Sequence, residues 1–211
     1  MSFKIAIQDG EKFNTFSHLM GAFFATCGAA LLMRSAVLSH DSEKIFTCFI
    51  YCFSTVLIYV ISTLYHSSNG PKKDVFRRLD YIGIYLKIAG NYTPFMILAI
   101  RGLPGYSVLM VVWAIAAVGV MIEAFFKPEN RLVPNLLYLS MCATVIPVLS
   151  KLFAAVHPLG FFLIMLGFAS YGVGFLFFLN DEKIKHGHGI WHMFVIAGTA
   201  AQYFCLLMYV V

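Results

Sequence analysis

Three histidines and one aspartate are the residues of this sequence best suited to chemistry. His66 ends the second strongly apolar segment of the chain, and Asp80 opens the third. His188 and His192 open the last apolar segment as HGIWH, and a spacing of four residues puts both imidazoles on one face of a helix. Zinc accepts imidazole and carboxylate ligands, and three histidines with one water form a known catalytic arrangement. These four residues therefore predict a metal site if the fold brings their segments together.

The segments that carry these residues are too apolar for an ordinary soluble domain. Hydrophobic residues make up 60% of the 211 residues and charged residues only 12%, and the mean hydropathy is +0.81. A membrane-spanning helix needs about 20 predominantly apolar residues. Seven segments meet this requirement, at about residues 16–38, 45–66, 79–100, 104–126, 132–150, 158–180 and 188–210. We therefore expect an all-α membrane protein, a bundle of seven transmembrane helices that forms a single domain over residues 1–211.

The basic residues at the helix ends predict the orientation of the bundle. Ten of them flank one set of ends: Lys4, Lys12, Lys72, Lys73, Arg77, Arg78, Lys127, Arg131, Lys183 and Lys185. The opposite ends carry Lys44, Arg101 and Lys151. Because basic residues are enriched on the cytoplasmic side, we expect a cytoplasmic N-terminus and, after seven crossings, a C-terminus outside. The net charge of +5 then reflects topology and attraction to anionic lipid, and we expect no nucleic-acid partner.

This orientation puts the three histidines and Asp80 at the same depth. They lie within roughly two helical turns of the cytoplasmic interface, a band of about 10 Å. Ser62 lies one turn before His66 on the same helix face, so it points toward the same neighbours. Asp80 could bind the metal directly or hold its water, and Ser62 could hydrogen-bond either one. The sequence leaves these alternatives open.

Other polar residues near the helix ends have simpler interpretations. His18, His40 and His157 each stand alone, and we interpret them as packed residues or as residues that reach the interface. Glu11 and Asn14, together with His18, could cap and anchor the first helix at the interface, since Asn is a preferred N-cap, or they could take part in the site. Both interpretations stay open.

Lys87 is an unusual residue for the middle of an apolar segment. It lies seven residues after Asp80, at nearly the same helical angle. It could pair with Asp80, raise the positive potential near the metal, or extend its ammonium group to the cytoplasmic interface. We favour the ion pair or the extended arrangement, because an unpaired ammonium is unfavourable in a bilayer.

Four short motifs resemble those of one membrane-protein family. STLYH contains SxxxH, LDYIGIYLKIAGNYTPF follows it, HGIWH opens the last helix, and EKFNTFSH near the start is similar to an ExxNxxxH segment. In this order they resemble the hemolysin III branch of the PAQR family, which includes the adiponectin and progestin receptors. The resemblance implies seven helices, a cytoplasmic N-terminus and a zinc ion near the cytoplasmic side. On the family's pattern His66, His188 and His192 would coordinate zinc, Asp80 would hold the zinc water and Ser62 would sit beside it. The resemblance also implies a multi-pass protein of a bacterial plasma membrane.

Our main functional hypothesis is a zinc-dependent hydrolase of a lipid amide or ester. Zinc would polarise the carbonyl and activate water, and Asp80 would pass a proton to the leaving group. The resemblance supports it, because the wider superfamily includes alkaline ceramidases. The expected partners are membrane lipids, among them an acyl-lipid substrate.

The main alternative is a non-enzymatic sensor of membrane state with a structural zinc. A pore-forming cytolysin, implied by the name hemolysin, ranks third. Transport is disfavoured because the ionisable cluster lies near one face and not at the midplane.

Overall fold

The structure is a computed structural model that describes residues 7–126, 128 and 130–211. All regular elements in these residues are helical. The elements are α1 (Lys12–Leu38), α2 (Ser42–Ser67), α3 (Pro71–Pro94), the π-helix η1 (Phe95–Ile100), α4 (Gly102–Met121), the π-helix η2 (Ile122–Phe126), α5 (Leu132–Ala143), the 3-10 helix η3 (Ile146–Val148), α6 (Leu149–Ala155), α7 (Pro158–Leu179) and α8 (Gly187–Tyr209). The expectation of an all-α fold is confirmed for the described residues.

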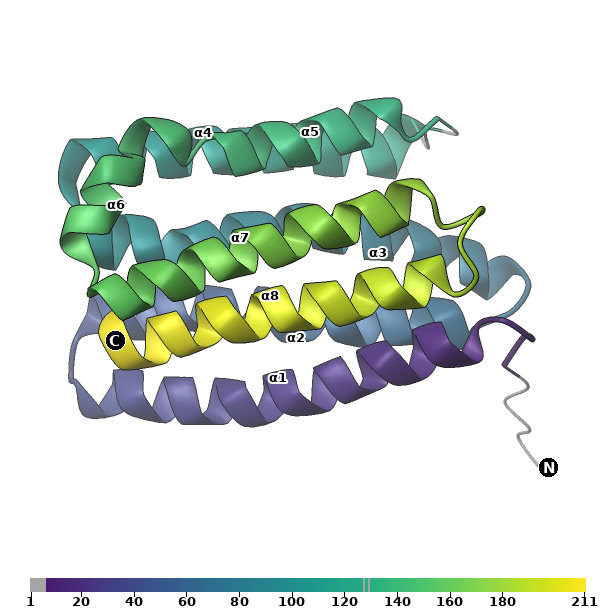
Figure 1. Cartoon of the computed structure of the whole chain (residues 1–211), viewed down its shortest axis with the longest axis horizontal. Helices are drawn as coiled ribbons and strands as arrows, with labels where there is room; N and C mark the ends of the chain where they lie inside the picture. The colour runs from purple at the N-terminus through teal and green to yellow at the C-terminus, as the bar shows by residue number, and fades with distance from the viewer. Residues whose placement is uncertain (1–6, 127, 129) are drawn as a thin grey trace.

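The long helices run back and forth along the long axis of the molecule, which is horizontal in Figure 1. Helices α4 and α5 lie on one side, α1, α2 and α8 lie on the other, and α3 and α7 run between them. Helix α2 packs against both α1 and α3, and α7 packs against α8. Helix α1 begins at one end of the bundle and α8 finishes at the opposite end. This arrangement places the end of α2 near the starts of α1, α3 and α8.

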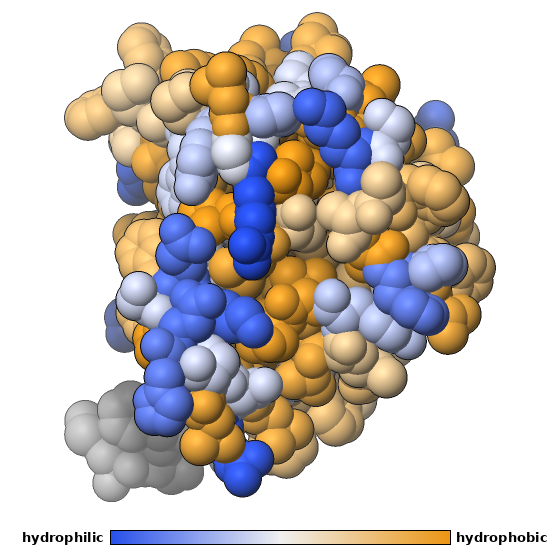
Figure 2. All heavy atoms as spheres, turned by 90° about the vertical axis from the view of Figure 1, so that its left-hand side faces the viewer, coloured by the Kyte–Doolittle hydropathy of each residue, from blue (hydrophilic) through white to orange (hydrophobic). Residues whose placement is uncertain are grey.

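Among the residues that the structure describes, six helical stretches are long and apolar enough to cross a membrane. They are Lys12–Leu38, Ser42–Ser67, Gly102–Phe126, Leu132–Ala155, Pro158–Leu179 and Gly187–Tyr209. Large apolar side chains such as Phe23, Met110 and Phe162 are exposed on the flanks of the bundle. Figure 2, an end-on view, shows patches of hydrophilic side chains on the end face, with hydrophobic side chains between them and a mostly hydrophobic rim. The chain is thus a multi-pass membrane protein, because such flanks suit lipid and not water.

The expected helix at residues 79–100 corresponds to α3 and η1, which are not among these six stretches. Helix α3 begins at Pro71 and is the most polar of the long helices. The expected helix at residues 132–150 is interrupted: α5 ends at Ala143, and η3 and α6 follow. Pro147 accounts for this break, because proline has no backbone N–H to continue the helix.

The basic residues are segregated between the two ends of the bundle. One end of the bundle contains the start of α1 and three loops, which connect α2 to α3, η2 to α5 and α7 to α8. The remaining loops lie at the other end. Lys4 and Lys127, two of the ten residues counted at the first end, lie outside the described residues. Arg34, omitted from the count above, is exposed one turn before α1 ends. The second end therefore carries four basic residues, and the charge difference remains.

Two tight turns and one close helix contact position the site. Gly70 has a φ of 62°, a conformation that glycine adopts without strain, and it reverses the chain between α2 and Pro71 at the start of α3. His186, with a φ of 61°, precedes α8 in the same way. Gly189 packs directly against the ring of Phe13, where a side chain on Gly189 would overlap the ring. This glycine lets the first turn of α1 approach the first turn of α8.

Candidate metal centre

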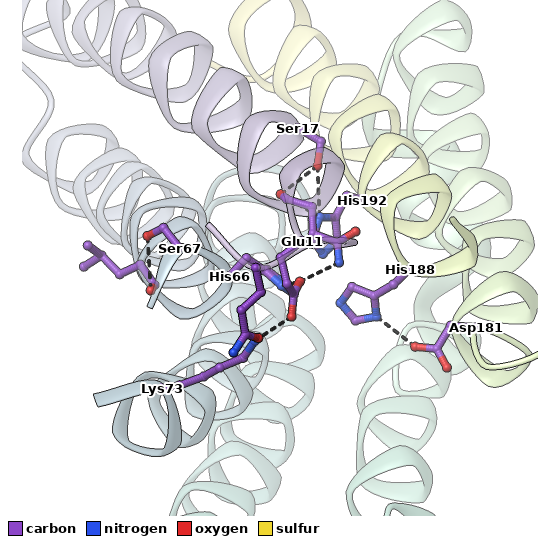
Figure 3. Close-up of polar contacts among 11 residues, drawn as sticks. Glu11, Ser17, His66, Ser67, Lys73, Asp181, His188 and His192 are labelled. Carbon is purple, nitrogen blue, oxygen red and sulfur yellow. Dashed lines mark hydrogen bonds and ion pairs between the residues drawn. The ribbon is translucent and has the colours of Figure 1, made fainter. Parts of the chain in front are cut away.

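The structure brings the three histidines together at one end of the bundle. His66 comes from the last turn of α2, and His188 and His192 come from the first turns of α8. Each offers one ligand atom, and these atoms all lie within 4.8 Å of one another. Figure 3 shows the three rings converging on one point. A metal ion would therefore bind between α2 and α8.

A second layer of side chains holds the Nδ1 atom of each histidine. The Nδ1 of His66 lies 2.7 Å from Oε2 of Glu11, and the Nδ1 of His188 lies 2.9 Å from Oδ2 of Asp181 (Figure 3). The Nδ1 of His192 lies 3.0 Å from Oγ of Ser17 and 3.3 Å from the Asn14 carbonyl oxygen. All three imidazoles are thus oriented through the same ring atom.

These partners fix the tautomers of the rings. Carboxylates and carbonyl oxygens only accept hydrogen bonds, so Nδ1 carries the proton and donates it. The Ser17 hydroxyl donates to the Asn14 carbonyl at 2.9 Å, so it too accepts from His192. Each Nε2 atom therefore keeps its lone pair, and that of His66 is buried without a hydrogen-bond partner among the described residues. Three neutral imidazoles aimed at one point fit a zinc-type metal, with the outer partners that such ligands usually have.

Glu11 is the most connected of the outer partners. Its Oε1 accepts a hydrogen bond from Lys73 Nζ at 2.6 Å, and its Oε2 accepts one from Asn14 Nδ2 at 2.8 Å. Burial alone would raise the pKa of Glu11, but the hydrogen bonds from His66, Lys73 and Asn14 outweigh burial and lower it well below its usual value. The hydrogen bond from His188 likewise lowers the pKa of Asp181. Both carboxylates therefore stay ionised at neutral pH.

The sequence left the role of Glu11 and Asn14 open and did not predict that Ser17 or Asp181 would contact a histidine. Glu11 is the N-cap residue of α1, yet its side chain makes no cap hydrogen bond and contacts His66 instead. Asn14 lies inside α1, so the capping interpretation is wrong for both residues. The EKFNTFSH motif, which contains both residues, was the sequence feature that could have indicated their role in the site. Ser17 lies in the same segment, but the ExxNxxxH pattern does not include it, and Asp181 lies in an irregular loop, so the sequence singled out neither residue.

Two cavities meet at the histidines. A polar vestibule of about 480 Å³ opens at the end of the bundle and is lined by residues that include Glu11, His66, Arg131 and His188. A cavity of about 250 Å³ runs between the helices and reaches His188 and His192 from the other side. Its walls are mainly apolar and aromatic: Ile58, Ile84, Tyr92, Tyr138, Phe168, Phe175 and Trp191 are among them. We call this space the inner cavity.

Ser62 and Asp80 line the inner cavity beside the histidines. Both are buried, with 1% and 8% of their surfaces exposed. Asp80 is not one of the three residues whose ligand atoms cluster. Asp80 therefore lines the same cavity as His188 and His192 but lies outside the three-histidine cluster.

His18, His40 and His157 do not belong to the three-histidine cluster. His18 is buried, and its ring stacks on that of His192 with the ring centroids 3.6 Å apart. His18 is thus a packing neighbour of a candidate ligand. His40 and His157 are exposed. His40 lies in the loop between α1 and α2, and His157 is the N-cap residue of α7, so both lie at the end of the bundle opposite to the start of α1.

The structure contradicts both favoured interpretations of Lys87. No ion pair between Lys87 and Asp80 occurs among the described residues, and Lys87 is only 8% exposed, so it does not extend to the interface. Its Nζ atom lies 4.7 Å from the centre of the Tyr51 ring. An aromatic face attracts a cation, which is the contact that the sequence pattern could not predict.

Comparisons with known proteins agree with this architecture. The sequence profile described as "Haemolysin-III related" matches residues 8–203. The chain is 35% identical over 198 residues to "Hemolysin-3" of Bacillus cereus, covering 93% of this chain and 90% of the relative. It is also 35% identical over 199 residues to "Hemolysin-3 homolog" of Bacillus subtilis (strain 168), covering 94% and 93%. The human "Monocyte to macrophage differentiation factor" is 27% identical over 202 residues, covering 93% and 82%.

The profile match spans the candidate ligands and their outer partners from Glu11 to His192. Together with the six membrane-length helices, the bacterial relatives place the chain in a bacterial plasma membrane as a multi-pass protein. The chain therefore belongs to the haemolysin-III related family, as its four short motifs predicted.

Proposed function

We propose that this protein is a zinc-dependent hydrolase of lipid amides or esters. One observation carries the proposal: the three free Nε2 atoms lie where a polar vestibule and an apolar inner cavity meet. Hydrolysis of a lipid needs water on one side of the reacting carbonyl and space for hydrocarbon on the other. A metal held at this junction would have access to both.

Zinc is the metal that the ligands favour. Three neutral imidazoles form the ligand set of known zinc sites that keep a fourth position for water or substrate. When bound, zinc supplies Lewis-acid polarisation of a carbonyl and activation of water near neutral pH. The carboxylates of Glu11 and Asp181 increase the basicity of two of the ligands through their hydrogen bonds.

The protein's own residues bind the substrate, admit water and transfer the proton. The apolar walls of the inner cavity bind the acyl chain, and the vestibule admits water and releases the polar product. Asp80 accepts a proton from the attacking water and gives it to the leaving amine or alcohol as the carbonyl–nitrogen or carbonyl–oxygen bond breaks. The buried hydroxyl of Ser62 has no hydrogen-bond partner among the described residues, so it would be available to hydrogen-bond the carboxylate of Asp80 and hold it toward the reacting carbonyl.

The proposed membrane topology has seven crossings within a single domain, with the N-terminus in the cytoplasm and the C-terminus outside. Helix α3 and η1 together form the remaining crossing, because they extend along the bundle beside the other helices (Figure 1). A membrane-impermeant maleimide added outside intact cells should then label a Lys151→Cys variant and not a Lys185→Cys variant, both positions being exposed. The reverse labelling pattern would overturn the orientation.

The function is tested by measuring metal and turnover in the same samples. Detergent-purified wild type and His192→Ala are analysed for metal content and then assayed for fatty-acid release from a panel of N-acyl and O-acyl lipids. We expect about one zinc per wild-type chain, release of fatty acid, and loss of both in the variant. His157→Ala, an exposed histidine at the other end of the bundle, is the matched control and should keep both. Zinc without any release would instead support a structural metal that ties α2 to α8.

A further inference from the structure

The inner cavity contains a second polar position, away from the histidines. Lys87 lines this cavity, and its Nζ atom has no hydrogen-bond partner among the described residues. Asn91, one turn further along α3, lines the cavity as well. Its Nδ2 donates to Oε1 of Gln202 at 3.0 Å, whereas its buried Oδ1 has no partner in the described part of the chain. Two unsatisfied polar groups thus share one wall of a mostly apolar space.

These two groups are unexpected in an apolar environment. A buried ammonium without hydrogen bonds is strongly unfavourable, and the Tyr51 ring compensates for only part of the lost hydration. Lys87 and Asn91 are four residues apart, so their side chains lie on the same face of α3. Asp80 is two turns away on that helix and forms no ion pair with Lys87. The arrangement provides a buried amine for which the described residues supply no anion, and a bound carboxylate would stabilise its protonated form.

We propose that Lys87 and Asn91 form an anion subsite that binds the carboxylate of a single-chain lipid. Lys87 donates to the carboxylate, and rotation of the hydrogen-bonded amides of Asn91 and Gln202 turns an N–H of Asn91 toward the same group. The hydrocarbon of the ligand lies along the apolar walls between this subsite and the histidines.

The geometry limits the length of the ligand. Lys87 follows Asp80 by seven residues, which corresponds to roughly 10 Å along the helix axis. A medium-length chain therefore spans the distance from the subsite to the histidines. This inference goes beyond the proposed hydrolysis and does not depend on it, because binding at Lys87 requires neither metal nor turnover.

The test compares two probes that differ only in charge. Binding of decanoate and of decanol to protein purified in a neutral maltoside detergent is measured by titration calorimetry at neutral pH. We expect wild type to prefer decanoate, and Lys87→Met, which removes the charge at similar length, to lose about tenfold or more of the decanoate affinity. Its affinity for decanol should stay unchanged.

A metal-free variant separates the two places where a carboxylate could bind. His192→Ala should keep the preference for decanoate if Lys87 provides the anion site, and loss of the preference would assign the carboxylate to the metal and overturn the proposal. Asn91→Asp introduces a negative charge next to Lys87 and should abolish the preference. Metal content and thermal melting identify any variant that fails to fold, so Asn91→Asp decides the matter if Lys87→Met is unstable. Unchanged preference in a folded Lys87→Met or Asn91→Asp variant would refute the subsite.

Discussion

The hydrogen bond between His66 and Glu11 joins residues that are 55 positions apart in the chain, at 2.7 Å. It connects the end of α2 to the start of α1 and also sets the ring orientation of a candidate metal ligand. Because Glu11 also accepts from Lys73 and Asn14, the carboxylate is itself held in place before any metal binds. The site is therefore organised by its outer layer as much as by its ligands.

Glu11→Gln should weaken metal binding without removing a ligand. The amide can accept a hydrogen bond from His66, but it lacks the negative charge that makes the imidazole more basic and that pairs with Lys73. Loss of such an outer carboxylate reduces metal affinity by about 10- to 100-fold. Competition with a fluorescent zinc chelator measures the change. Asp9→Asn is the control, because Asp9 is exposed and, among the described residues, forms its ion pair with exposed Lys12. Equal affinities in Glu11→Gln and wild type would contradict the role.

The partners of His188 and His192 should differ in importance. Asp181→Asn removes a charged acceptor from His188 and is expected to weaken zinc binding about as much as Glu11→Gln does. Ser17→Ala removes a neutral acceptor, and the Asn14 carbonyl oxygen remains within 3.3 Å of His192. We therefore expect only a severalfold effect from Ser17→Ala. The same chelator competition ranks the two variants, with exposed Glu182→Gln as the control for Asp181. A larger loss in Ser17→Ala than in Asp181→Asn would reverse our assignment.

Metal removal should destabilise the protein, because the candidate ligands come from two helices that lie far apart in sequence. A ligand that binds only the folded state at about 100 times its dissociation constant adds about 2.7 kcal/mol of stability. We expect a chelator to lower the Tm of detergent-purified wild type, measured by thermal melting. His192→Ala provides the comparison, since a chelator should leave its Tm unchanged. A chelator-independent Tm in zinc-loaded wild type would show that the metal does not link α2 and α8.

The sequence predicted the candidate ligands better than their surroundings. His188 and His192 were predictable because a spacing of four residues fixes their common face in any helix. His66 could be added because charge patterning placed its helix end on the same side of the membrane, whereas Asp80, placed there by the same argument, lies outside the cluster of ligand atoms. The contact of Asp181 with His188 depends on the irregular turn before α8, and that of Glu11 depends on how α1 packs against α2. Neither follows from periodicity.

The limits of helix prediction have similar physical causes. The apolar segments located the long helices, but hydropathy does not mark where α3 begins, because the residues that follow Pro71 in its first turns are mostly polar. The interruption after Ala143 follows from Pro147, because proline breaks or kinks a helix. The sequence does not show at which residue the helix begins again. The contact of Lys87 with Tyr51 could not be predicted from one segment alone, because it depends on how α2 packs on α3.

Asp80→Asn separates a catalytic metal from a structural one. Asp80 lines the inner cavity but does not belong to the cluster of ligand atoms, so its replacement should leave zinc bound. The amide cannot accept a proton from water, and loss of a general base typically lowers turnover by about 10²- to 10⁴-fold. Fatty-acid release and zinc content are therefore measured on the same preparation of the variant, with Asp74→Asn as the control on the exposed first turn of α3. Full activity in a zinc-loaded Asp80→Asn protein would exclude the proton-transfer role. Loss of zinc in this variant would instead identify Asp80 as a direct ligand, and the hydrolase mechanism would then need another base.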